Sequence, residues 1–277
     1  MNLTIEIQNQ IPENVEKYII KLINKKKSYK SYGEISSKEI SYIKYHIKIK
    51  FNIKINSQII ISIKSAYMKN YMINNYYKLK LYSKKLIQEY STNNIIKLCS
   101  KYDISPMTIL RFILESKYKL KIKYIILNLD ILSSYDLEQL KLAIKSDIYN
   151  LLDQNSISIA ATEFENKIEK ILTKLNIKFR TQQELTIEQI KLYNKPINTP
   201  DFLIDSELII NNIKINWIDA KNFYGSNIPF VKKKIEKQIK KYINTYGSGC
   251  IIFRSFSSGL KFSNVLLLSY KSIKNIV

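Results

Sequence analysis

Residues 199–221 read TPDFLIDSELIINNIKINWIDAK, and they carry the clearest indications of the fold that we expect for the C-terminal half of the chain. Pro200 has no N–H to donate to a β-ladder, so it belongs at the start of the strand that follows Asp201. Asn211 and Asn212 tolerate the left-handed backbone that a tight hairpin requires. We therefore predict apolar strands joined by a hairpin that returns the chain beside Asp201.

Charged side chains converge where the returning strand ends. Residues two apart on a strand point to the same face, so Asp219 and Lys221 are expected to project together toward Asp201. Two carboxylates at one point suit a hard cation such as Mg²⁺, with Mn²⁺ as an alternative. Such a metal would activate water and neutralise charge on phosphorus, while Lys221 would orient or deprotonate that water or stabilise the phosphate. The pattern predicts metal-dependent phosphodiester hydrolysis.

Two further residues belong to the predicted site. A helix from about 158 to 175 supplies a third carboxylate, and Glu165 is preferred over Glu163. A helix from about 232 to 245 carries Gln238, which would reach the scissile phosphate or the attacking water. Each element alone is unspecific, because Asp-x-Lys, Pro-Asp and a helical Glu are common surface features of a lysine-rich chain. Their order along the chain is what favours a nuclease.

The same order of elements resembles the PD-(D/E)xK nuclease superfamily, and within it the family with a Thr-Pro-Asp signature that includes the codanin-interacting nuclease. The matching segments are EFE at 163–165, TPDF at 199–202, WIDAK at 217–221, Gln238, and YGSG at 246–249 before CIIF at 250–253. This resemblance implies a restriction-endonuclease-like α/β core with a mixed sheet. It also implies a nuclear or nucleocytoplasmic protein with a codanin-like partner.

The chain departs from the family at two places. The family carries Glu where this chain has Asp219, a change that the superfamily motif permits and that shortens the side chain by one methylene. In the animal family an acidic pair follows the phenylalanine-glycine turn after the lysine, whereas residues 223–227 here contain none. Any role of that pair is therefore not expected in this protein.

The first half of the chain, residues 1–154, is predicted to be a mostly helical domain, followed by the nuclease domain at 155–277. Residues 51–63 alternate isoleucine with polar residues and fit either a strand or a helix. The boundary between the two domains is placed where the texture changes from long helical periodicity to short apolar runs.

A helix-turn-helix is expected between residues 93 and 118. Ser105 as N-cap and Pro106 at the first helical position explain why a second helix starts there. That helix would lie in a DNA major groove, with Thr108 and Arg111 as candidate contacts. A helical hairpin that only packs on its neighbours is an equal alternative, because no glycine marks the turn.

The composition narrows the classes of partner. Lysine and arginine number 45 against 23 acidic residues, which gives a net charge of +22. This charge favours nucleic acid, with DNA as the first expectation, although lysine-rich coding alone also produces a basic chain. Cys99 and Cys250 lack the spacing of a disulfide framework or a thiolate zinc site, and the single His46 makes a histidine-based triad improbable. No apolar run approaches the length of a membrane helix, so no membrane partner is expected.

A second hypothesis keeps the fold without the chemistry. The chain would then be a non-catalytic nucleic-acid-binding or adaptor protein, whose binding depends on salt but not on Mg²⁺ or on Asp201. The intact set Asp201, Asp219 and Lys221 argues against it, because a site without chemistry has no physical reason to keep a costly cluster of like charges.

Overall fold

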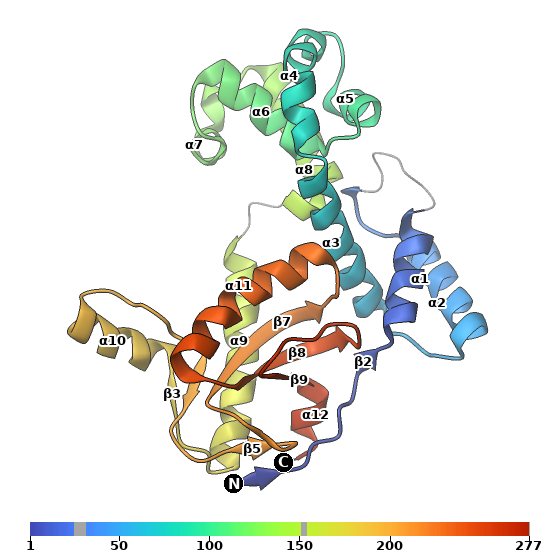
Figure 1. Cartoon of the computed structure of the whole chain (residues 1–277). Coiled ribbons are helices and arrows are strands. Elements are labelled where there is room, and N and C mark those ends of the chain that lie inside the picture. Colours follow the sequence, from blue (N-terminus) through green and yellow to red (C-terminus); the bar gives the residue numbers. More distant parts are fainter. Residues whose placement is uncertain (25–31, 151–153, 277) are drawn as a thin grey trace. The chain divides into compact units, whose positions relative to one another are not determined.

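The computed structural model describes residues 1–24, 32–150 and 154–276 and divides into two compact units. The sheet unit consists of residues 1–18 and 154–277, and the helical unit consists of residues 19–153 (Figure 1). The predicted fold class is confirmed: helices come first, and a mixed sheet with flanking helices follows. Within the described residues, none of the helices combines the length and the apolar character that crossing a bilayer requires.

The first residues of the chain differ from the expectation that 1–154 form one helical domain. Strand β1 (Asn2–Leu3) pairs with β5, and strand β2 (Gln10–Ile11) pairs with β8. Helix α1 (Glu13–Asn24) begins in the sheet unit, where Glu16 is buried against Ser226. These long-range contacts place residues 1–18 in the sheet unit.

Helices make up the helical unit, and those from α3 to α8 contribute to one apolar core. These elements are α2 (Ser37–Phe51), α3 (Ser57–Asn74), α4 (Tyr77–Tyr90), α5 (Ile95–Tyr102), α6 (Pro106–Tyr118), α7 (Ile122–Leu127), η2 (Leu129–Ile131), α8 (Ser134–Ser146) and η3 (Ile148–Asn150). The isoleucine-rich stretch that fitted either a strand or a helix is helical from residue 57 onward. Asn56 caps it by accepting a hydrogen bond from Gln58 N, and Ile59, Ile60 and Ile63 are buried.

The main sheet of the sheet unit runs in the order β2-β8-β7-β4-β3, with β9 also paired to β8. Its elements are α9 (Gln154–Lys174), β3 (Phe179–Thr181), α10 (Gln182–Tyr193), β4 (Phe202–Ile204), β7 (Trp217–Gly225), α11 (Pro229–Tyr246), β8 (Gly249–Ser257), β9 (Val265–Ser269) and α12 (Tyr270–Lys274). Strands β2, β7 and β9 each pair parallel with β8. The pairs β3–β4 and β4–β7 are antiparallel. The sheet is therefore mixed, as predicted.

The predicted hairpin is present as a small sheet of its own. Strand β5 (Ile209–Ile210) pairs antiparallel with β6 (Ile213–Lys214), and β1 joins β5. Asn211 and Asn212 have φ values of 50° and 65°, so both adopt the left-handed backbone expected of them. The chain then enters β7, which lies antiparallel to β4.

Helix α11 covers one face of the main sheet, and α9 and α12 cover the other (Figure 1). An apolar core lies on each face. Ile218 and Ala220 of β7 belong to the core shared with α9 and α12, whereas Trp217 belongs to the core shared with α11. Because side chains alternate along a strand, Asp219 and Lys221 take the face of Trp217. Asp219 and Lys221 are thus placed on the α11 side of the sheet, but they lie within β7 and not at its end, because the strand continues to Gly225.

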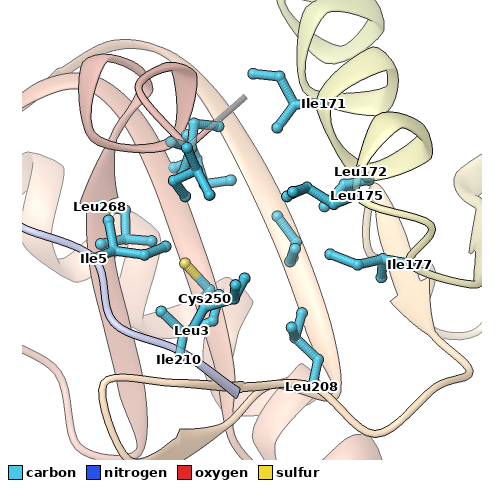
Figure 2. Close-up of a pocket in the computed structure, with 14 residues that line it drawn as sticks. Leu3, Ile5, Ile171, Leu172, Leu175, Ile177, Leu208, Ile210, Cys250 and Leu268 are labelled. Atoms are coloured by element: carbon cyan, nitrogen blue, oxygen red, sulfur yellow. The ribbon is translucent and has the colours of Figure 1, made fainter. Parts of the chain in front are cut away.

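A small pocket lies within the core on the α9 side (Figure 2). Aliphatic side chains such as Ile171 and Leu268 line it together with Cys250. Burial raises the pKa of the Cys250 thiol, which keeps it uncharged. The pocket therefore offers apolar packing space and none of the charged groups singled out from the sequence.

Candidate active site

The backbone that holds the candidate site comes from β4 and β7. Phe202 lies opposite Ile218 in the antiparallel register, which brings the start of β4 beside the first residues of β7. Asp201 immediately precedes β4, and its Oδ2 accepts a hydrogen bond of 2.6 Å from Ala220 N. Pairing between the two strands therefore places the Asp201 carboxylate at the backbone of Ala220, the residue between Asp219 and Lys221.

An ion pair occupies the centre of the site. Lys221 Nζ lies 2.5 Å from Asp219 Oδ2, and the Asp219 side chain is 0% exposed. The Lys221 ammonium is itself largely covered, with 14% of the side chain exposed. The structure thus brings together Asp201, Asp219 and Lys221, the three residues that sequence order placed at the centre.

Burial and like charge make the two aspartates reluctant to ionise. Burial is the main cause that raises the pKa of Asp201, and the Asp219 charge raises it further, while Lys221 opposes both. Burial also raises the pKa of Asp219 despite the Lys221 ion pair. For Lys221, burial alone would lower the pKa, but Asp219 and Asp201 outweigh it and the pKa is raised. With all three groups ionised, the cluster carries excess negative charge around the fully buried carboxylate of Asp219.

Glu165 extends the cluster from helix α9. Its side chain is half-buried, whereas Glu163 on the same helix is exposed. Burial raises the pKa of Glu165, with Lys221 lowering it and Asp219 raising it. Glu165 is therefore close enough to the ion pair to interact with it electrostatically. Because Glu163 is exposed, Glu165 stays the preferred third carboxylate.

Gln238 reaches the site from α11. Its Nε2 donates to Asp219 Oδ1 at 3.4 Å and to the Tyr242 hydroxyl at 3.0 Å. The Tyr242 hydroxyl in turn donates to Thr199 O at 3.3 Å, and its ring packs on Trp217 with centroids 5.2 Å apart. Tyr242 was not among the residues predicted from the sequence, although its place one helical turn after Gln238 puts both side chains on neighbouring parts of one helix face.

The loop before Asp201 is fastened by a second residue that the sequence analysis missed. Asn198 is buried, and its Nδ2 donates to Lys241 O and to Thr245 Oγ1, both at 2.9 Å. Its carbonyl accepts from the Tyr246 hydroxyl at 2.7 Å and from Gln189 Nε2 at 2.8 Å. Helices α10 and α11 therefore hold the Thr-Pro-Asp segment in place.

The carboxylate oxygens of the site are suitable ligands for a hard divalent cation, but their arrangement is less suitable than their chemical type. Asp219 Oδ2 is buried and lacks a well-directed hydrogen bond, although Lys221 Nζ is close to it. Carboxylate oxygens of this kind are what Mg²⁺ takes from proteins, together with several waters. Across the described part of the chain, however, no three His, Cys, Asp or Glu side chains are grouped as a metal-holding set. Asp201 and Asp219 thus fit two metal ligands, and Glu165 is a neighbour of that pair.

The candidate DNA contacts lie in the helical unit. The turn between α5 and α6 contains Asp103 in a left-handed conformation, the role that a glycine often takes. Ser105 caps α6 as predicted, and its Oγ lies 2.7 Å from Thr108 Oγ1.

Arg111 differs from Thr108 in its surroundings. It is exposed, and its Nε donates to Glu115 Oε1 at 3.3 Å. The start of α6 is buried, and Met107 N donates to Asp147 Oδ2. A recognition helix reads bases with its first residues, and those of α6 are buried. DNA contact by Thr108 and Arg111 therefore stays a prediction.

Comparisons with known proteins match the part of the chain that holds this site. A family model described as "Protein of unknown function TPD sequence-motif" matches residues 134–263. An uncharacterized protein of Acanthamoeba polyphaga mimivirus, L539, is 31% identical over 118 residues, which make up 41% of this chain and 41% of the viral protein. The chain thus spans less than half the length of that relative. No solved structure matches the chain significantly.

Proposed function

We propose that the sheet unit is a divalent-metal-dependent nuclease of the PD-(D/E)xK type that hydrolyses phosphodiester bonds, with DNA as the first substrate. The observation that carries this proposal is a cluster of charged groups: buried Asp219 forms an ion pair with the largely covered Lys221, and the half-buried Asp201 is held beside them by Ala220 N. Unpaired like charges in a protein interior are costly, and strongly perturbed pKa values cluster at functional sites. A bound metal cation would offset the excess negative charge of the carboxylates, and a substrate phosphate would pair with the Lys221 ammonium.

Each residue has a role that its surroundings support. Asp201 and Asp219 would hold Mg²⁺ or Mn²⁺, which when bound supplies Lewis acidity and an activated water. Lys221, kept protonated by the carboxylates around it, stabilises negative charge on the phosphate. Gln238 positions the attacking water or the phosphate and is itself positioned by Tyr242. Glu165 adds negative charge and a further oxygen ligand beside the pair.

A non-catalytic adaptor is the second candidate. One observation favours it: no grouping of three metal-ligating side chains is found among the residues that the structure describes. Such a protein would bind nucleic acid through its basic surface and would need neither Mg²⁺ nor Asp201. A nuclear location and a codanin-like partner rest on the resemblance alone and stay predictions.

The test is a cleavage assay on a panel of labelled substrates. Purified full-length protein is incubated with single-stranded, duplex, splayed and junction DNA and with RNA, in Mg²⁺, Mn²⁺ or EDTA. The variants are Asp201→Asn and Lys221→Met, which keep side-chain size. The matched control is Asp205→Asn, because Asp205 lies just beyond the other end of β4 and pairs with Arg180 at the surface.

The two candidates give different results in this assay. The nuclease proposal expects metal-dependent cleavage that is lost in Asp201→Asn and Lys221→Met and kept in Asp205→Asn. Binding without cleavage on every substrate and with every metal, unchanged in Asp201→Asn, would favour the adaptor. Cleavage that is equally fast in Asp201→Asn would reject the proposed site.

A further inference from the structure

An exposed aromatic ring lies on β7 beside the candidate site. Phe223 follows Lys221 by two residues, and its side chain is 43% exposed. Its ring packs edge-on against Phe253, with centroids 5.9 Å apart and an interplanar angle of 66°. Phe253 is buried in the core that α11 shares with the sheet. Phe223 therefore packs on Phe253 on the α11 side of the sheet, and part of its ring is exposed to solvent.

Helix α11 carries six lysines against one glutamate. Its buried side is fixed by Ile235, Ile239 and Tyr242. At 100° per residue, Lys234 and Lys241 lie within roughly 60° of Gln238 on the helix surface. Both lysines are exposed, and neither has an ion-pair partner among the described residues. The face of α11 that presents Gln238 to Asp219 is thus flanked by positive charge one turn away on each side.

The two ends of α11 point to different ends of the site. Tyr242, the next residue after Lys241, packs on Trp217 at the start of β7, so the Lys241 end of α11 lies at the start of β7. Lys234 lies one turn before Gln238, toward the beginning of α11, which follows the end of β7. Phe223 also lies toward that end of β7, beyond Lys221. The order across the site is therefore Lys241, then the charged cluster, then Lys234 and Phe223.

We propose that Phe223 is a stacking platform for an unpaired base and that Lys234 and Lys241 hold backbone phosphates on either side of the cleaved bond. The site then takes a single strand, or an unpaired stretch of a longer nucleic acid. Base stacking on an exposed aromatic ring requires a free base face, which an intact duplex does not offer without unstacking. This inference rests on the proposed function, since it names the substrate class of the same site.

Binding without cleavage tests the inference separately from the chemistry. Fluorescence anisotropy is measured for full-length protein with a labelled oligothymidylate and with a blunt duplex of equal length, in EDTA. Phe223→Leu keeps an apolar contact with Phe253 but removes the aromatic face, and Phe223→Trp restores one. The pair Lys234→Gln with Lys241→Gln is compared with Lys233→Gln and Lys240→Gln, which have the same spacing on a more distant face of α11.

The expected results are specific to the single strand. Phe223→Leu weakens oligothymidylate binding by about tenfold and leaves duplex binding unchanged, and Phe223→Trp restores the affinity. The Lys234 and Lys241 double variant lowers the slope of log affinity against log salt by about 1.4, and the control pair lowers it less. Unchanged binding in Phe223→Leu, an equal loss for duplex, or an equal effect of the control pair would overturn the inference.

The outcomes also separate this inference from the nuclease proposal. Single-strand binding that depends on Phe223, in a protein that cleaves nothing, would support the inference and reject the nuclease. Cleavage that depends on Asp201, with normal single-strand binding in Phe223→Leu, would support the nuclease and reject the inference.

Discussion

Asp136 in the helical unit and Asp219 in the sheet unit are both 0% exposed, yet their surroundings are opposite. Four side chains donate hydrogen bonds to Asp136: Tyr90, Lys117, Tyr118 and Ser133. Burial would raise the pKa of Asp136, but these hydrogen bonds outweigh it and the pKa is lowered. This carboxylate is satisfied, and its role is to hold helices α4, α6 and α8 together.

Asp219 has fewer donors and more negative neighbours. It pairs with Lys221 and accepts a long hydrogen bond from Gln238, while Asp201 lies beside it. Its pKa is raised where that of Asp136 is lowered. A buried charge that its own fold satisfies stabilises structure, whereas one left with like charges is suited to a cation and to chemistry. The comparison therefore separates a structural aspartate from a candidate catalytic one.

The largest expected effect on stability is at Asp136. Replacing it in Asp136→Ala leaves the Lys117 ammonium and three hydroxyl groups without their acceptor, and we expect the helical unit to lose about 3 to 5 kcal/mol of stability. Urea unfolding followed by circular dichroism measures this change. Asp136→Asn is the milder control, because its amide oxygen still accepts hydrogen bonds. Equal stability of Asp136→Ala and wild type would show that Asp136 does not hold the helical unit together.

A smaller effect of opposite sign is expected at Asp201. A raised pKa in the folded state means that its contribution to stability is complete below about pH 4 and is lost as pH rises through the folded pKa. Asp201→Asn removes the charge and keeps an acceptor for Ala220 N. In EDTA we expect this variant to be more stable than wild type by about 1 to 2 kcal/mol at pH 8, and by less at pH 5. Urea unfolding at both pH values checks the sign. A loss of stability at pH 8 would contradict the account.

The smallest effect concerns positioning. Tyr242→Phe removes the hydroxyl that links Gln238 to Thr199 O, at a cost of about 1 kcal/mol in stability. We expect kcat to fall several-fold while KM changes little, because Gln238 loses its orientation and the substrate contacts remain. Tyr246→Phe is the matched control, since its hydroxyl bonds to Asn198 O and not to Gln238. A change in stability alone, equal in both variants, would show that Tyr242 is only structural.

The sequence predicted those features whose signals are local. Pro200 starts a strand because of its own chemistry, and Asn211 with Asn212 form a turn because they tolerate positive φ. Asp219 and Lys221 share a face because strand alternation is a local rule. The order of these residues along the chain was therefore enough to predict that Asp201, Asp219 and Lys221 lie close together.

The features that the sequence analysis missed depend on distant contacts. Strands β1 and β2 have two residues each, too few for periodicity, and they pair with partners more than 200 positions away. The contact of Tyr242 with the site depends on which side of α11 packs against the sheet, and the tertiary structure determines that side. Asn198 likewise gained its role from α10 and α11, which fold over the segment it precedes.

The most direct test of the account is a cleavage time course with wild type and Asp219→Asn, run with Mg²⁺ and with EDTA on single-stranded and duplex substrates. Circular dichroism confirms beforehand that both proteins are folded. We expect wild type to cut at least one substrate only when the metal is present, and Asp219→Asn not to cut it. Equal cleavage by both proteins, or cleavage by wild type in EDTA, would contradict a metal-dependent site built on Asp219.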